Sequence, residues 1–320
     1  MPSFHRIARI IVPTLFVAVS ACRSGSSNAV PTVVSAPAAV PPARIARNIP
    51  RNVLYVSDYT NLDVMAFSAD PHAQNTQPLL TIGLGAHPYG LWVDRQGVLY
   101  VAAGDSVQEF KPGATTPFLT IIQGINRAEG VVVDSKGTLY VVVNAGVDVA
   151  VVEYPAGSTT PSQTLTMTVS GSQFGFPGGA TFDPAGNLYV DATFYPESTG
   201  HIFRFAPGQT TGTDLGLADA GSQDGLAVDA KGNLYVGFFG QVEVYRAGAT
   251  QPFKKIGVPS DYPSFFARSP KGIVYEPVAA SVPSNSALLE FAPTSQKPVN
   301  SITGSFFSAP IGAAVRSAAF

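Results

Sequence analysis

The sequence contains little charge. Its 320 residues include 19 lysines and arginines and 21 aspartates and glutamates, a charged share of 12% with a formal net charge of −2. Soluble domains usually carry about 25% charged residues. A chain this close to neutrality has no electrostatic basis for binding nucleic acid, so we expect no nucleic-acid partner. The low share of charged residues is typical of strands that are buried on both faces.

Cysteine and the common catalytic motifs are nearly absent. Cys22 is the single cysteine, which excludes an internal disulfide, a Cys₄ zinc site and a Cys-x-x-Cys redox pair. The sequence also lacks a glycine-rich phosphate loop, a His-Glu-x-x-His motif and a Gly-x-Ser-x-Gly motif. Strong helix signals do not occur beyond the first 20 residues. Composition therefore favours an all-β chain without a marked catalytic centre.

The N-terminus has the pattern of an export signal. Two arginines precede the apolar stretch Ile10–Val19, which is shorter than the ~20 residues that span a bilayer. We therefore predict a signal peptide over residues 1–21. Val19-Ser-Ala-Cys22 resembles the bacterial lipobox, in which cleavage precedes a cysteine that then carries diacylglycerol. The alternative is ordinary cleavage at the same place, which leaves a soluble product.

Residues 22–50 are rich in alanine, proline, serine and valine. Such a segment is extended and does not build a core, so we predict a tether that follows a lipidated Cys22. Arg23, rather than aspartate, follows the cysteine, so the common signal for inner-membrane retention is missing. We therefore expect an exported lipoprotein of the bacterial cell envelope, anchored in the outer membrane and facing the periplasm or the exterior.

A hairpin unit repeats along the rest of the chain. In Gly225–Val236, two apolar β-forming runs flank a turn in which Asp229 precedes Gly232 by three residues. Aspartate at the first position and glycine at the fourth are typical of a type I turn. The turn alone requires these aspartates, and this explains them better than an acidic ring does. Further copies begin at Gly90, Gly130, Gly179, Phe265 and Gly312.

The repeat predicts the fold. The Leu-Tyr pair of the unit, or its equivalent, recurs every 40 to 49 residues, and a third strand ending in an aromatic residue, a turn and usually a fourth short strand follow it. This is the pattern of propeller blades. The first blade has no glycine-initiated strand, so we predict that Gly312–Val315 supplies it and closes the ring. We therefore expect a six-bladed β-propeller with four-stranded blades over residues 51–320.

The segment Pro88–Val101 resembles an NHL repeat, Pro177–Val190 resembles it similarly, and Val56–Val64 resembles the other half of that repeat. The likeness covers about residues 51–320 and implies the propeller fold rather than an activity. Related six-bladed rings include the gluconolactonase and senescence-marker family and the paraoxonase-like lactonases. The resemblance implies a divalent metal at one mouth of the channel, held by Glu, Asp, Asn or His.

Four oxygen-bearing residues fall in the loops that such propellers gather on one face. Asp58, Glu129, Asn144 and Asp224 would suit Ca²⁺, Mg²⁺ or another divalent cation. The alternative is that they are solvated loop residues and strand caps. Arg268 is a separate oddity, because it stands where other copies have valine or phenylalanine. Its charge must find an ion-pair partner or reach the water of the channel.

Aromatic residues concentrate in the same loops. Such side chains stack sugars and apolar ligands or anchor partner proteins, although simple loop packing explains them equally well. The predicted rim residues are His87, Tyr89, Phe176, Phe194, Tyr195, Phe239 and Tyr262. Two functions follow. The first is an envelope-tethered module that binds a protein or small molecule through its rim, and the alternative is a metal-dependent lactonase or lyase.

The lipid anchor gives a direct test. We expect wild-type protein to partition with membranes and Cys22→Ala to become soluble, because the variant has no thiol to acylate. Fractionation of cells expressing each form measures this difference. Equal partitioning of the two forms would remove the anchor.

Overall fold

The computed structural model describes residues 52–70, 73–146, 148–172, 174–195, 199–217, 225–238, 240–258 and 264–316. The predicted signal peptide, Cys22 and the tether lie outside these ranges. Within them the chain forms 24 strands and one short 3₁₀ helix, Pro283–Asn285. None of the described residues belongs to a helix long and apolar enough to cross a membrane.

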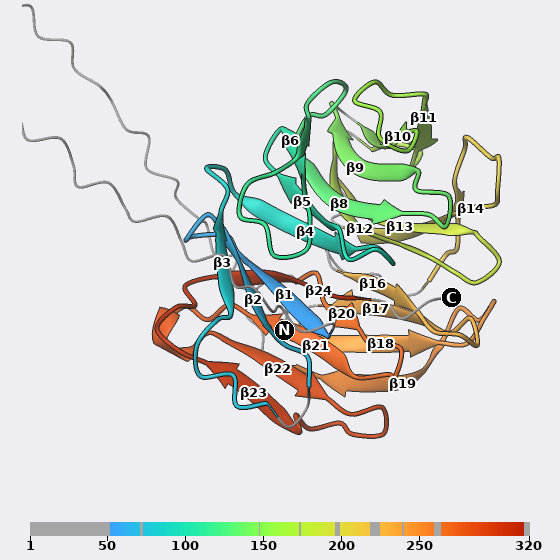
Figure 1. Ribbon diagram of the computed structural model, residues 1–320. Helices are drawn as coiled ribbons and strands as arrows, with labels where there is room; N and C mark the ends of the chain where they lie inside the picture. The colour runs from blue at the N-terminus through green and yellow to red at the C-terminus, as the bar shows by residue number, and fades with distance from the viewer. Residues whose placement is uncertain are drawn as a thin grey trace, which may run out of the picture. The chain divides into compact units, whose positions relative to one another are not determined.

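The strands form six antiparallel sheets of four strands, which confirms the predicted six-bladed propeller (Figure 1). We name the sheets blades A to F. From the inner to the outer strand, blade A consists of β24 (Pro310–Val315), β1 (Val53–Asp58), β2 (Asp63–Ser68) and β3 (Leu80–Gly83), and blade B of β4 (Pro88–Val93), β5 (Leu99–Ala103), β6 (Ser106–Phe110) and β7 (Leu119–Ile121). In the same order, blade C consists of β8 (Ala128–Val133), β9 (Leu139–Ala145), β10 (Asp148–Tyr154) and β11 (Gln163–Met167), and blade D of β12 (Phe174–Phe182), β13 (Leu188–Tyr195), β14 (Thr199–Phe205) and β15 (Thr213–Asp214). Blade E consists of β16 (Leu226–Val228), β17 (Leu234–Phe238), β18 (Gln241–Tyr245) and β19 (Pro252–Gly257), and blade F of β20 (Ala267–Arg268), β21 (Val274–Val278), β22 (Ala287–Phe291) and β23 (Asn300–Thr303).

The repeated aspartates stabilise the turns between first and second strands, as predicted. In blade D, Oδ1 of Asp183 accepts hydrogen bonds from the backbone N–H groups of Ala185 and Asn187, at 2.9 and 2.8 Å. Gly186 completes this turn at φ +83°, a value that favours glycine. Asp134 and Asp229 accept backbone N–H groups in the same way. These carboxylates therefore serve local structure.

The C-terminal strand closes the ring. β24 pairs antiparallel with β1, and in Figure 1 the blue β1 lies beside β24 from the far end of the chain. The buried carboxylate of Asp58 reinforces this junction, because it accepts hydrogen bonds from the backbone N–H groups of Ser308 (2.7 Å) and Ala309 (3.0 Å). It also accepts the N–H groups of Thr60 and Asn61, which hold its own loop.

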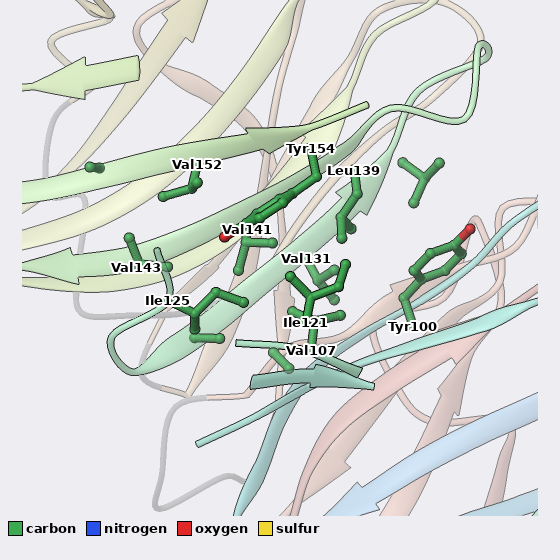
Figure 2. Close-up of a cluster of buried hydrophobic side chains, with 14 residues drawn as sticks. Tyr100, Val107, Ile121, Ile125, Val131, Leu139, Val141, Val143, Val152 and Tyr154 are labelled. Atoms are coloured by element: carbon green, nitrogen blue, oxygen red, sulfur yellow. The ribbon is translucent and has the colours of Figure 1, made fainter. Parts of the chain in front are cut away.

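The core lies between neighbouring blades. Figure 2 shows one layer, in which Val107 and Ile121 of blade B meet Val131, Val141 and other side chains of blade C. At Gly90, Gly130, Gly225 and Gly312 the backbone of the next blade approaches so closely that it leaves no room for a Cβ. A Cβ on Gly130 would collide with the carbonyl oxygen of Gly178 in the next blade. The repeated glycine is therefore a packing requirement of the ring.

Closure by β24 predicts a strong dependence of stability on the C-terminus. Deleting residues 309–320 removes the inner strand of blade A and exposes β1, so we expect a large fall in melting temperature. Asp58→Ala leaves buried N–H groups without an acceptor and should cost about 2–4 kcal/mol of unfolding free energy. Asp148→Ala, a partly exposed aspartate at the start of β10, is the control. Unchanged melting of the deletion variant in thermal denaturation would contradict the closure.

Candidate functional site

The two ends of the blades differ in composition. We call the end where the inner strands begin the upper rim, and the end with the Asp-x-x-Gly turns the lower face. At the lower face each first turn packs on the second turn of its own blade. A Cβ on Gly137 would contact Ala156, and one on Gly186 would contact Pro207. The lower turns are therefore similar from blade to blade, whereas the loops of the upper rim vary.

Three aromatic rings of blades A and B meet at the upper rim. Tyr59, in the loop after β1, stacks on His87 with ring centroids 4.1 Å apart and an interplanar angle of 16°. Its edge also meets Tyr89 of β4 at 5.6 Å. Nδ1 of His87 lies 2.9 Å from the carbonyl oxygen of Tyr59, which fixes the imidazole in the stack. Loop packing thus holds these partly exposed rings in one orientation.

A second group of rings stands on blade D. Phe174 and Tyr195 stack with centroids 4.7 Å apart, and Phe176 meets both of them edge-on. Phe174 pairs with Tyr195 across β12 and β13, so the sheet register itself places the rings together. The side chain of Phe174 is 41% exposed. An apolar ring on a rigid strand is thus presented to solvent.

An ion pair of blade C lies beside the rings of blade D. The Arg127 guanidinium lies 5.1 Å from the ring centroid of Phe176, and its Nε lies 2.5 Å from Oε1 of Glu129. Glu129 is 1% exposed. The pKa of Tyr89 is raised to about 12, first by the burial of its own side chain and then by the charge of Glu129. Arg127 thus contacts the rings of blade D, and the charge of Glu129 acts on Tyr89 of blade B. We call the whole set the aromatic crescent: Tyr59, His87, Tyr89, Arg127, Glu129, Phe174, Phe176 and Tyr195.

The backbone of Arg127 is shaped for this role. Its φ is +50°, which is uncommon for a residue other than glycine, and its N–H donates to Oδ1 of Asp105 at 3.0 Å. A residue kept in this conformation is over-determined by its surroundings. The guanidinium is thus directed to a fixed place between Glu129 and Phe176.

The four predicted metal ligands have separate environments in the part that is described. The carboxylate of Asp58 accepts backbone N–H groups, and that of Glu129 pairs with Arg127. Asn144 accepts the N–H of Gly146 at 2.8 Å and donates to the carbonyl of Gly175 at 3.2 Å. Asp224 lies outside the described residues. Among those described, no three His, Cys, Asp or Glu side chains are grouped to hold a metal ion, so the divalent-cation site stays a prediction.

The predicted rim residues divide into three sets. His87, Tyr89, Phe176 and Tyr195 belong to the aromatic crescent, and their role in binding stays a prediction. Phe194 does not lie on the rim surface: its side chain is 1% exposed and packs into the core between blades C and D, because the strand directs alternate residues to opposite faces. Phe239 and Tyr262 lie outside the described residues.

Three members of the crescent, Tyr59, Arg127 and Phe174, are absent from the predicted rim residues and metal ligands. Tyr59 follows Asp58 directly in the same loop, so the loop position that selected the aspartate also signalled the tyrosine. Arg127 precedes Glu129 by two residues and directly precedes β8, so the two charges are close along the chain. The two-residue spacing of an arginine and a glutamate could therefore have predicted this ion pair.

A second buried acid lies on blade F. Glu276 stands where the other copies have valine, and it is 3% exposed. The hydroxyl of Ser264 donates to its Oε1. Burial raises the pKa of Glu276 to about 8, against the lowering effect of that hydrogen bond. The arrangement holds a proton near neutral pH, but it lies apart from the residues of the crescent.

Glu129 predicts a pH dependence of stability. Burial raises its pKa from 4.5 to about 7 although Arg127 opposes the shift, so the folded protein binds this proton more tightly than the unfolded chain. The resulting stabilisation is present below pH 4.5 and is lost as the pH rises through 7. We expect the melting temperature of Glu129→Gln to fall less than that of wild type between about pH 5 and 8. Glu153→Gln, on β10 of the same blade, is the control, and parallel curves for Glu129→Gln and wild type would refute the shift.

Comparison with known proteins supports the fold and goes no further. No protein-family model matches the sequence, and no match is found among curated proteins. A chain of a nidogen/laminin complex superposes with a TM-score of 0.64 at 17% identity, covering 82% of this chain and 98% of that one. A Bacteroides caccae protein of unknown function gives 0.62 at 11% identity, with the same coverage. TolB from Acinetobacter baumannii gives 0.59 at 12% identity, covering 82% of this chain and 66% of its own. At these identities the likeness establishes the six-bladed propeller alone.

Proposed function

We propose that the protein is a binding module of the bacterial cell envelope that engages a partner protein through the aromatic crescent. The observation that carries the proposal is the arrangement of the crescent: ordered rings lie on blades A, B and D, and Arg127 of blade C, paired with Glu129, contacts the ring of Phe176. A surface that spans four blades suits a macromolecule better than a small ligand, which usually occupies an enclosed pocket.

The composition of the crescent supports protein binding. Tyrosine and arginine are enriched among the few residues that dominate the binding energy of protein interfaces, and phenylalanine is enriched in the interfaces themselves. Stacking and edge contacts already hold these rings, so little side-chain entropy remains to be lost when a partner binds. Arg127 is 41% exposed while its carboxylate partner is buried, so the guanidinium can still donate to an incoming acceptor.

The structural neighbours are compatible with this proposal. One of them comes from a complex of nidogen with laminin. Kinship with NHL-repeat propellers, the lipid anchor at Cys22 and the place in the outer membrane are proposals from the sequence. A metal-dependent lactonase or lyase is the weaker alternative, because backbone N–H groups occupy the carboxylate of Asp58 and Arg127 pairs with that of Glu129.

Site-specific photo-crosslinking tests the proposal. p-Benzoylphenylalanine replaces Phe174 in the crescent, and in a matched protein it replaces Phe253. The two phenylalanines are 41% and 49% exposed, and Phe253 starts an outer strand at the lower face. We expect irradiation in the native host to give a discrete adduct from position 174 only.

The adduct must also depend on the chemistry of the crescent. Adding Arg127→Ala to the position 174 protein removes the cation between the two groups of rings, so the yield should fall by about tenfold if the contact is worth 1.4 kcal/mol. Adducts of equal yield from positions 174 and 253, or an adduct indifferent to Arg127, would show that the upper rim is not the binding face.

A further inference from the structure

We propose a second binding site at the opposite end of the ring: the lower part of the central channel takes a small organic anion, a carboxylate carried on an apolar body. The site is independent of the aromatic crescent. Its parts are a cavity, an arginine within it and a sector of the mouth in which the repeated aspartate has been replaced.

The cavity is the channel between the inner strands. It has a volume of about 1280 Å³ and is lined by residues of all six blades, from the repeated glycines down to the turns of the lower face. Phe265, which replaces the glycine in blade F, extends so far that its ring would contact a Cβ on Gly90 of blade B. The phenylalanine therefore narrows the channel at its middle and leaves a compartment that opens at the lower face.

Arg268 places a positive charge in this compartment. It stands where four other copies have valine, and its guanidinium lies 5.0 Å from the ring centroid of Tyr235 in blade E. No carboxylate pairs with it among the described residues, and its Nε is buried without a hydrogen-bond partner there. The Nε itself is out of reach of a ligand in the channel, but the Arg268 side chain is partly exposed and lines the cavity, so its charge is available to an anion there.

The mouth beside Arg268 lacks the aspartates of the other blades. In blade F the turn position of the repeat is Ser269, and in blade A it is Arg316. The Arg316 guanidinium reaches blade B, where its Nη2 donates to the carbonyl oxygen of Arg95 at 2.6 Å. Lys271 adds an exposed cation to the turn of blade F. Two neighbouring blades thus replace an acidic ring position with neutral or basic residues.

The remaining carboxylates of the mouth are engaged in their own turns. Asp94, Asp134 and Asp183 line the cavity on blades B, C and D. Their Oδ1 atoms accept backbone N–H groups between 2.8 and 2.9 Å. Glu109, which also lines the cavity, has a pKa raised by burial to about 7. An anion is therefore directed to the side of blades F and A.

The wall of the compartment defines the rest of the ligand. Ala227, Ala267 and Ala314 occupy the position that Trp92 has in blade B and Thr181 has in blade D, so the wall on the side of blades E, F and A is short and apolar. The site therefore offers a guanidinium and an apolar surface, which together match a carboxylate on a hydrocarbon or aromatic body.

Trp92 makes the test direct, because it is the only tryptophan in the chain. Wild-type protein is titrated with 4-phenylbutyrate and with decanoate, and binding is followed by tryptophan fluorescence and by calorimetry. We expect saturable binding that weakens with salt. The neutral amide of 4-phenylbutyrate should bind at least about tenfold more weakly, because it lacks the charge that Arg268 recognises.

The repeat supplies the matched variant. Arg268→Val installs the residue of the other copies, so the fold should persist, and affinity for both carboxylates should fall by about tenfold or more. Arg268→Lys retains the charge in case the valine variant does not fold, and it should bind measurably. Asp148→Ala, at the start of β10 on the upper rim, should leave binding unchanged. No saturation with either carboxylate up to about 10 mM, or equal affinity of wild type and Arg268→Val, overturns the proposal.

Discussion

The pairing of β24 with β1 is the constraint on which the rest of the molecule depends. Blades of this kind bury their faces only against neighbours, so an open ring would leave two faces and two strand edges in water. The register between Leu54 and Val315 fixes where the last strand lies, and the Asp58 carboxylate binds the backbone that leads into it. A single buried side chain thereby joins segments about 250 residues apart in the sequence.

Closure divides the molecule into a repetitive end and a variable end. The lower turns all perform the same structural task, so their aspartates and glycines are set by backbone geometry. The upper loops connect blades of different length and have no such common task. Side chains there can be arranged by contacts between blades, as the stack of Tyr59 on His87 and the reach of Arg127 to Phe176 illustrate. The aromatic crescent is a product of this freedom.

Much of the fold could be predicted because the determinants are local and repeated. Short segments of sequence are sufficient to predict the Asp-x-x-Gly turns, the blade period and the role of Gly312–Val315. The site was less accessible, since it depends on which loops meet across blades. The loop position of Asp58 suggested a metal ligand, but the structure shows its oxygens accepting N–H groups of a segment far along the chain, a contact that no local pattern reveals. Phe194 and Tyr195 illustrate the same limit, because adjacent strand residues point to opposite sides and composition cannot assign them.

The residues that the blades share are those that the propeller structure requires, so a residue that departs from the repeat needs another explanation. Phe265, Arg268, Ser269 and Glu276 all replace a residue that the other blades use, and all four lie on blade F. Packing does not require a charge at 268, since valine fills that position in four other copies. A sequence that keeps a buried N–H donor without an acceptor at Arg268 accepts a loss of stability there. Because function is the usual reason for breaking a local rule without a structural gain, the departures on blade F are the basis of the proposed anion site.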